Sequence, residues 1–402
     1  MIDWLVVSVA DVSRVITKGT TPTTLGARFQ EHGINFVKVE SLASGRIDHD
    51  RLAYIDGETH ALLKRSVLEE NDVLFSIAGT IGRTARVEAV DLPANTNQAI
   101  AIIRPNLEVV NRDFLFYCLN DKRRIATAQS RVVQSVQQNL SLSELGNVVI
   151  PLPPLDEQKV IAATLGALDD KIESNRRIRS LLRTIGVAKF EFAIERGGVS
   201  QLFLADACKS IARGIAPKYA DSDSMAPLVL NQKCIRGGWI SLRPARRMVD
   251  RQIALARKAS SGDILVNSTG QGTLGRVGRW HQGSIFVDGH VSVVRPNNDV
   301  VPPTVLAYAL FGREAEIEGL ATGSTGQTEL SPTMLGSLRI TLPSHDVASE
   351  LEEDLFSLES RSEQLEREIL LLGQLRDVLL PELLSGRIQT SEALRALPGE
   401  SS

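Results

Sequence analysis

The sequence predicts a mixed α/β fold in which two copies of one α/β domain are separated by two long helices that form an antiparallel coiled coil. One observation is a repeated motif, Q-x-x-L-S-x-x-x-L-G, which begins at Gln137 and again at Gln327. Another is a Leu-Pro pair after each motif, about 190 residues apart, where proline ends a strand ladder. The third is a heptad pattern of apolar residues after each Leu-Pro pair, which is typical of a long amphipathic helix.

The first domain is predicted to cover residues 1–152. Its strand patterns are separated by glycine turns, notably Gly19–Pro22 and Ala78–Arg83. In chain order, the expected elements are a strand with a helical turn within residues 4–16, strands at 35–42, 72–77 and 97–105, and a helix over 113–128.

The second domain, residues 196–343, repeats these landmarks in the same order. Gly214-x-x-Pro217 matches Gly19-x-x-Pro22, and Gly272–Arg276 matches Gly79–Arg83. Shared glycines and prolines indicate shared backbone turns, so we expect one fold for both domains. The side chains between the landmarks differ almost everywhere. Two copies of one scaffold that carry different surface side chains suggest that the two domains bind different ligands of the same kind.

Two long helices are expected after the domains, within residues 153–195 and 344–388, and the tail at 389–402 is expected to be disordered. Asp156 is predicted to cap the first helix, and each helix is on the order of 50 Å long. Asn175 and Ser362, at seam positions, either set the register or are tolerated near a helix end. The predicted apolar seam consists of Ile161, Leu165, Leu168 and Ile172 in the first helix, and Leu351, Leu355, Leu358, Leu365, Ile369 and Leu372 in the second.

Composition limits the function classes. The chain has 402 residues, a formal net charge of −3 and three widely spaced cysteines, which argue against a disulfide framework. No apolar run reaches the ~18 residues of a membrane span, so we expect a cytoplasmic protein without a membrane partner. The small net charge conceals an asymmetry, because residues 196–343 carry roughly six more basic than acidic groups.

One glycine-rich loop invites a cofactor interpretation. Gly270–Gly275 matches G-x-G-x-x-G and follows a predicted strand. The residues after it do not open a helix that could hold a pyrophosphate, and the equivalent loop of the first domain lacks the first glycine. A tight turn between strands is therefore the favoured interpretation, with a nucleotide-binding enzyme as the alternative.

Catalytic and metal-binding patterns are not found in the sequence. There is no phosphate-binding G-x-x-x-x-G-K-[ST] loop, and the six histidines are scattered without ligand spacing. Asp169 and Asp170 form a carboxylate pair, but they flank the helix seam and are expected to face solvent. We expect no catalytic residue, no metal site and no cofactor in this chain.

Basic and amide side chains near the glycine turns of both domains suggest DNA binding. Lys and Arg can neutralise phosphates, and Gln and Arg can bind base edges with two hydrogen bonds, although a single Arg is more often a solvated charge. The candidate DNA-contacting residues are Lys18, Thr20, Thr80, Arg83, Arg86, Gln134, Gln137 and Gln138 in the first domain, and Arg213, Lys218, Arg246, Arg247, Gln271, Thr273, Arg276 and Gln327 in the second.

The complete pattern resembles the specificity subunit of type I restriction–modification systems. A variable domain that ends in Q-x-x-L-S is followed by P-L-P-P-L-x-E-Q-x-x-I-A-x-x-L-x-x-L-D-x-x-I-x-x-N, from Pro151 to Asn175, and the G-T-x-x-G loops at Gly79 and Gly272 look like that family as well. The second proline segment departs from the pattern, because Leu342–Asp346 lacks the P-P and E-Q. The residues assigned to the spacer and to partner docking are Glu157, Gln158, Ile161, Leu165, Leu168, Ile172, Asn175, Leu355, Leu358, Leu365, Ile369 and Leu372.

The resemblance implies a non-catalytic subunit of a larger complex. Each target-recognition domain would read one half of a bipartite site in double-stranded DNA, and the helices would set the spacing. The implied partners are two methyltransferase subunits and a restriction subunit, with S-adenosylmethionine, ATP and Mg²⁺ on those partners. A structural coiled-coil scaffold is the second alternative, which should not hold duplex DNA.

Overall fold

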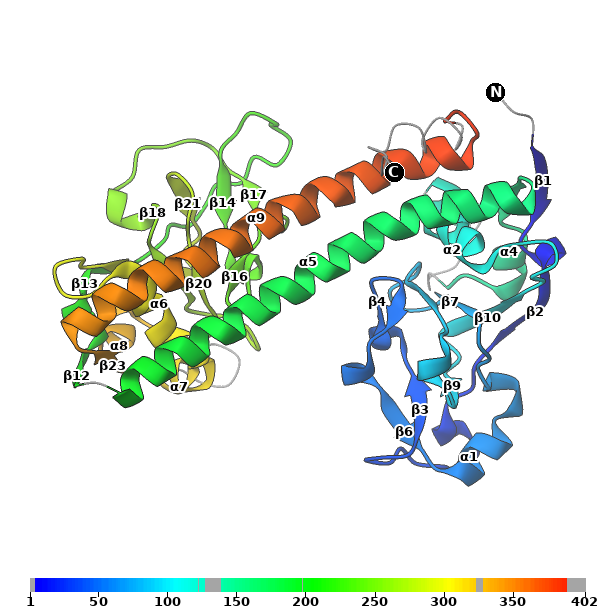
Figure 1. Ribbon diagram of the computed structural model, residues 1–402, viewed down its shortest axis with the longest axis horizontal. Coiled ribbons are helices and arrows are strands. Elements are labelled where there is room, and N and C mark those ends of the chain that lie inside the picture. Colours follow the sequence, from blue (N-terminus) through cyan, green and yellow to red (C-terminus); the bar gives the residue numbers. More distant parts are fainter. Residues whose placement is uncertain (1–3, 122, 127–138, 197, 323–327, 389–402) are drawn as a thin grey trace, which may run out of the picture. The chain divides into compact units, whose positions relative to one another are not determined.

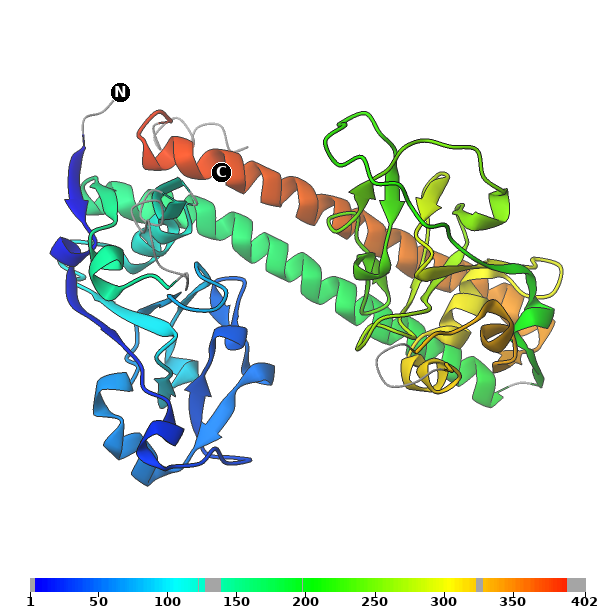
Figure 2. The same cartoon turned by 180° about the vertical axis from the view of Figure 1, so that it is seen from behind.

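The computed structural model describes residues 4–121, 123–126, 139–196, 198–322 and 328–388. The chain divides into two compact units: residues 1–174 with 368–402 form unit 1, and residues 175–367 form unit 2. Two long helices, α5 (Leu155–Arg196) and α9 (His345–Leu384), contribute residues to both units. Figures 1 and 2 show these helices and the strands of each unit from opposite sides.

Unit 1 has a four-stranded antiparallel sheet of order β2-β10-β7-β8 and a three-stranded sheet of order β6-β3-β9, and two strand pairs, β1-β11 and β4-β5, complete it. Its elements are β1 Leu5–Ser8, β2 Ser13–Lys18, β3 Ile34–Val37, β4 Leu42–Ala43, β5 Arg46–Ile47, β6 Ala53–Ile55, α1 Gly57–Leu62, β7 Val73–Ser76, β8 Thr84–Arg86, β9 Ala94–Thr96, β10 Ile100–Pro105, α2 Arg112–Asn120, α4 Leu142–Gly146 and β11 Val149–Leu152.

The four-stranded sheet of unit 1 is buried on both faces. Successive residues of a strand point to opposite faces, so β10 can be apolar throughout. Ala101 and Ile103 pack in a core with α2 and with the parts of α5 and α9 in this unit. Ile100 and Ile102 pack on the opposite face with Val37 of the three-stranded sheet. The sheet therefore joins the helices on one side to the smaller sheet on the other.

Unit 2 repeats this topology. Its main sheet has the order β13-β22-β19-β20, its second sheet the order β17-β14-β21-β18, and its strand pairs are β12-β23 and β15-β16. Its elements are β12 Val199–Phe203, β13 Cys208–Arg213, β14 Leu228–Leu230, β15 Ile235–Arg236, β16 Trp239–Ile240, β17 Arg246–Arg247, β18 Lys258–Ala259, β19 Ile264–Asn267, β20 Val277–Arg279, β21 Ile285–Val287, β22 Val291–Pro296, α6 Pro303–Leu310, α7 Glu314–Gly319, α8 Pro332–Gly336 and β23 Arg339–Pro343.

The repeated motif has the same structural role in both units. Ser141 caps α4 and Ser331 caps α8, each accepting a hydrogen bond at 3.1 Å from the amide three residues later. Gly146 and Gly336 end these helices where an added Cβ would lie 3.5 and 3.2 Å from an alanine methyl group. The motif thus encodes a capped helical turn that packs closely on the preceding chain, and the duplicated fold predicted from it is confirmed.

The two long helices run antiparallel within each unit, because a rising residue number on α5 pairs with a falling number on α9. This confirms the predicted antiparallel pairing. The ion pairs that show it are Asp169–Arg376 (2.7 Å) and Lys171–Glu368 (3.5 Å) in unit 1, and Arg183–Glu359 (3.3 Å) and Lys189–Asp354 (2.6 Å) in unit 2.

Two sequence predictions about α5 were wrong. Asp156 is not the N-cap, because α5 begins at Leu155 and the carbonyl oxygen of Pro154 accepts the amide of Gln158 at 3.0 Å. Asp156 instead lies in the acidic first turn, where a carboxylate complements the helix dipole. Asp169 does not face solvent, since Tyr117 and Arg376 cover its carboxylate. Asp170 is exposed, as expected, and pairs with the exposed Arg46 at 2.8 Å.

Candidate nucleic-acid interface

One edge of the main sheet in unit 1 brings two predicted loops together. β10 begins at this edge, where Ile100 pairs with Ser76 at the end of β7 and Ala101 pairs with Lys18 at the end of β2. The turn after β2 and the loop between β7 and β8 therefore emerge side by side. Lys18 and Thr80 are exposed there, and Thr20 is half-buried.

The loop between β7 and β8 is held by its own hydrogen bonds. The Ser76 hydroxyl donates to the carbonyl oxygen of Thr80 at 2.6 Å and accepts the amide of Arg83 at 2.7 Å. The Arg83 guanidinium, half-buried, donates to the carbonyl oxygen of Val39 at 3.3 Å. Among the contacts of the described residues, this hydrogen bond uses one of the five N–H donors of Arg83.

The same edge is formed in unit 2 from different side chains. Arg213 at the end of β13 pairs with Ser292, and Asn267 at the end of β19 pairs with Val291. Arg213 donates to the carbonyl oxygen of Ser268 at 3.1 Å and forms an ion pair with Glu329. This ion pair partly neutralises the cation at the position that Lys18 occupies in unit 1.

The loop between β19 and β20 carries Gln271, Thr273 and Arg276. Gln271 is exposed, and Arg276 donates to the carbonyl oxygen of Gly272 at 2.7 Å. A Cβ at Gly275 would lie 2.4 Å from the carbonyl oxygen of Glu314, and its φ of +84° favours glycine. Because β19 and β20 are antiparallel neighbours, the G-x-G-x-x-G segment lies in the loop from Ser268 to Arg276 that joins them and opens no helix. The expected connection between two strands is present, but it is a loop and not a tight turn.

A second basic group of unit 2 lies on its other sheet, in and beside β17. The Arg246 guanidinium stacks 3.4 Å from the centre of the Tyr219 ring and forms an ion pair with Asp221. This contact holds the pKa of the Asp221 carboxyl below its usual value. Arg247 donates to the carbonyl oxygen of Ala226, and Lys218 is exposed.

Some candidate residues are not at these edges. Arg86 lies at the far end of β8, where it pairs with Asp113 at 3.1 Å and stacks 4.4 Å from the centre of the Phe116 ring. Its side chain is only 12% exposed, so it is placed to support α2. Gln134, Gln137, Gln138 and Gln327 lie outside the described residues. For every candidate residue in both units, contact with DNA stays a prediction.

The residues of the predicted seam face the other long helix or pack into the core of a domain, as Ile161, Leu165 and Leu355 do. Leu168, Leu358 and Leu372 are half-buried, and so is Glu157. Asn175 is fully buried, and within the described part of the chain neither polar atom of its amide has a hydrogen-bond partner. The apolar seam residues that are buried are Ile161, Leu165, Ile172, Leu351, Leu355, Leu365 and Ile369.

Gln158, predicted to dock a partner, is instead fully buried within unit 1. Its side-chain oxygen accepts the amide of Asn111 at 2.8 Å, and its amide nitrogen donates to the carbonyl oxygens of Val109 and Pro153 at 3.2 and 2.8 Å. These contacts fasten the start of α5 to the loop before α2.

Unit 2 makes the corresponding connection with a residue that the sequence analysis missed. Glu352 of α9 accepts the backbone amides of Thr304 and Val305, at 2.9 and 3.0 Å from one carboxylate oxygen. These amides open α6, so the carboxylate satisfies free donors at a helix N-terminus. Although the second proline segment lacks the E-Q pair, Glu352 thus connects a long helix to the start of α6, as Gln158 connects α5 to the loop before α2.

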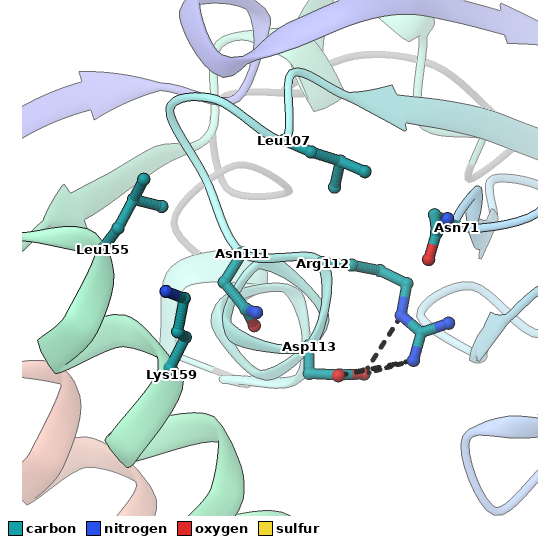
Figure 3. Close-up of a pocket in the computed structure, with 7 residues that line it drawn as sticks. All are labelled: Asn71, Leu107, Asn111, Arg112, Asp113, Leu155 and Lys159. Atoms are coloured by element: carbon teal, nitrogen blue, oxygen red, sulfur yellow. Dashed lines mark hydrogen bonds and ion pairs between the residues drawn. The ribbon is translucent and has the colours of Figure 1, made fainter.

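The pocket in Figure 3 lies at the opposite end of the unit 1 sheet from the loop edge, since Asn71 precedes β7 and Leu107 follows β10. Its cations are already paired: Arg112 with Asp113 and Glu88, both at 3.1 Å, and Lys159 with Asp156 at 3.1 Å. The other lining residues are Asn111 and Leu155. This lining does not place a nucleophile beside a general base.

Among the residues that the structure describes, no group of three or more His, Cys, Asp or Glu side chains could hold a metal ion. In the same part of the chain, every helix is too short or too polar to cross a membrane.

The sequence profile described as "Type I restriction modification DNA specificity domain" matches residues 1–183. This match supports the family resemblance for the first part of the chain. The specificity subunit of the type I restriction enzyme EcoBI from Escherichia coli is 31% identical over 165 residues, which cover 38% of this chain and 34% of that subunit. The putative MjaX specificity subunit from Methanocaldococcus jannaschii is 27% identical over 184 residues, 44% of this chain and 43% of that protein.

The sequence similarity covers only part of the curated relatives, whereas a structural similarity extends over nearly the whole chain. The chain spans 34% and 43% of the length of the two curated relatives. The solved S subunit of the type I restriction–modification system from M. genitalium shares 17% identity and covers 95% of this chain and 96% of its own, with a TM-score of 0.57. The predicted family resemblance and the predicted fold class are thus both confirmed.

Proposed function

We propose that this chain is the DNA-specificity subunit of a type I restriction–modification complex, in which each unit reads one half of a bipartite target in double-stranded DNA. The observation that carries the proposal is the loop edge formed in both units. The strand pairing at the two edges is equivalent, but Lys18 and Ala78 stand in unit 1 where unit 2 has Arg213 and Gln271. Two unlike surfaces on one scaffold suit two different half-sites.

The chemistry of these edges suits duplex DNA. Lys18 and Arg213 provide cations that can neutralise phosphates and fix the register of a domain on the duplex. Arg83, Gln271 and Arg276 have the donors and acceptors that pair with base edges in the major groove. Arg246 and Lys218 would add phosphate contacts from the second sheet of unit 2.

The long helices support the proposed spacing role. α5 has 42 residues and α9 has 40, which at 1.5 Å per residue corresponds to about 60 Å for each helix. In the proposed complex these helices set the distance between the half-sites and dock two methyltransferase subunits. A restriction subunit completes the assembly in the cytoplasm, and S-adenosylmethionine, ATP and Mg²⁺ bind those partners.

The two alternatives have less support. A nucleotide-binding enzyme needs a helix N-terminus after Gly275, where the chain continues instead into β20. A structural scaffold gives no reason for two exposed loop edges with different polar side chains. We therefore infer a non-catalytic subunit that supplies sequence recognition to its partners.

A reconstitution assay tests this function. Methyl transfer from S-adenosylmethionine to duplex DNA is measured with the purified chain, with methyltransferase subunits from the same system, and with both together. Transfer to a defined bipartite sequence is expected only with both. Appreciable transfer by the chain alone would refute the non-catalytic role, and the same sequence preference from the methyltransferase subunits alone would refute the specificity role.

A further inference from the structure

A tyrosine, a carboxylate and an arginine connect three helices in unit 1. The Tyr117 hydroxyl of α2 donates to the Asp169 carboxylate of α5 at 2.8 Å. Arg376 of α9 donates to the other oxygen of the same carboxylate at 2.7 Å. Burial and the neighbouring Asp169 charge raise the pKa of Tyr117, so its hydroxyl remains a donor. The helix of the recognition domain and both long helices therefore meet at one side chain.

The equivalent positions of unit 2 have the same residue types. Tyr308 of α6 follows Pro296 at the spacing by which Tyr117 follows Pro105, and Glu359 follows Pro343 at the spacing by which Asp169 follows Pro153. The arginine comes from the other long helix in both units: Arg183 of α5 forms an ion pair with Glu359 at 3.3 Å. We call each set of three residues a node: Tyr117–Asp169–Arg376 is node 1, and Tyr308–Glu359–Arg183 is node 2. In node 2 the tyrosine contacts the arginine, whose guanidinium lies 5.3 Å from the centre of the Tyr308 ring.

Node 2 is more deeply buried and has more contacts. The Glu359 side chain is 1% exposed and also pairs with His281 at 2.9 Å and with Arg279 at 3.4 Å. Arg279 ends β20 as Arg86 ends β8, so the sheet reaches this node as well. The two arginines exceed the charge of one carboxylate, and aromatic faces stabilise the excess. Arg183 lies 3.6 Å from the centre of the Phe311 ring and 4.1 Å from that of Trp239.

The tyrosine of node 2 is also fixed by shape. A Cβ at Gly186 of α5 would lie 2.3 Å from the Tyr308 hydroxyl oxygen. Glycine inside a helix is unfavourable by about 1 kcal/mol relative to alanine. Its presence here lets α6 approach α5 closely enough for Tyr308 to lie against the helix backbone.

We propose that the two nodes are the joints that fix the orientation of each recognition domain on the long helices, and that they thereby determine which spacer lengths between the half-sites the protein accepts. This inference rests on the proposed function. Node 2 does not include the loop edge of its sheet, because Arg279 ends β20 at the side opposite the Ser268–Arg276 loop. A node variant should therefore leave the recognition of bases at each half-site unchanged. It should weaken only the preference for one spacer length between the half-sites.

The test uses the full chain in complex with two methyltransferase subunits. The complex selects DNA from a library in which both half-sites are fixed and the spacer length varies. The variants are Asp169→Asn and Glu359→Gln, which replace the carboxylate with an amide of the same shape, and the milder Tyr117→Phe and Tyr308→Phe. We expect Asp169→Asn and Glu359→Gln to reduce the discrimination against spacers one base pair too long or too short by about tenfold, and the tyrosine variants to reduce it less, with half-site preference unchanged.

Two controls separate positioning from a general loss of stability. Ile102→Val and Ile235→Val remove one methylene from fully buried residues in cores that do not include the long helices. They should lower the melting temperature without changing spacer preference. The inference is overturned if folded node variants keep the wild-type spacer preference, or if they lose affinity equally for every spacer as a general stability defect would. If the wild-type complex selects no bipartite DNA, the proposed function itself fails.

Discussion

The Tyr308 hydroxyl lies where a side chain at Gly186 would have to be, since an added Cβ would come within 2.3 Å of its oxygen. Gly186 is in the interior of α5, where alanine would ordinarily stabilise the helix by about 1 kcal/mol. Gly373 in the interior of α9 is a matched site, because nothing lies within 4 Å of its ideal Cβ.

Alanine substitution should therefore have opposite effects at these two glycines. We expect Gly373→Ala to raise the free energy of unfolding by about 0.5–1 kcal/mol, and Gly186→Ala to lower it by about 1–3 kcal/mol because Tyr308 must shift. Urea denaturation of both variants measures the difference. Stabilisation by Gly186→Ala would show that α6 does not approach α5 at this point.

Gln158 should contribute to the stability of unit 1, although it belongs to the E-Q pair that was assigned to partner docking. Gln158→Ala leaves the amide of Asn111 and the carbonyl oxygens of Val109 and Pro153 without partners, at a cost of about 1–3 kcal/mol. Lys159→Ala is the control, since that side chain is 61% exposed and pairs with the exposed Asp156. In thermal unfolding, Gln158→Ala should lower the melting temperature clearly more than Lys159→Ala. Equal melting temperatures for the two variants would contradict the buried role of Gln158.

The sequence predicted those features that depend on neighbouring residues. The duplicated fold was predictable because serine caps, close-packed glycines and strand-ending prolines act locally, as Ser141 and Gly146 show. Node 1 was not predictable, because Asp169 and its partner Arg376 are 207 residues apart. A heptad pattern identifies the buried seam but cannot show that α2 covers a flanking position. The same limit applies to Gln158, whose partners precede α2 in another part of the chain.

Arg276 should contact DNA if the loop edge of unit 2 lies against the duplex. A phosphate contact predicts that Arg276→Ala weakens binding to all sequences and reduces the salt slope by about one unit. A base contact predicts relaxed specificity at one position of one half-site, at about 1–3 kcal/mol. Lys209→Ala, exposed at the opposite end of the same sheet, is the control. Affinity and salt slope unchanged by Arg276→Ala would mean that the loop does not bind DNA.

Glu359 should make unit 2 sensitive to acid. Burial tends to raise the pKa of this carboxyl, but His281, Arg183 and Arg279 together outweigh burial and hold the pKa below its ordinary value of 4.5. A depressed pKa in the folded state adds stability that is present above pH 4.5 and is lost as the pH falls through the folded-state pKa.

The corresponding measurement is thermal unfolding between neutral and acid pH. Glu359→Gln should melt at a lower temperature than wild type near pH 7, and the two curves should converge as the pH falls below 4.5. Glu316→Gln removes an exposed ion pair with Arg313 and should change little at any pH. A constant difference between wild type and Glu359→Gln across this range would contradict a charged Glu359 in the folded protein.

The most direct test of the central claim is a map of methylated bases in cellular DNA, with this chain present and with it deleted, in cells that keep the methyltransferase subunits. We predict a methylated motif of two specific halves separated by a spacer of fixed length and arbitrary sequence, present only with the chain. Substitution at Arg83 should alter only one half of that motif, and substitution at Arg276 only the other. An identical methylation map with and without the chain would contradict a role in DNA specificity.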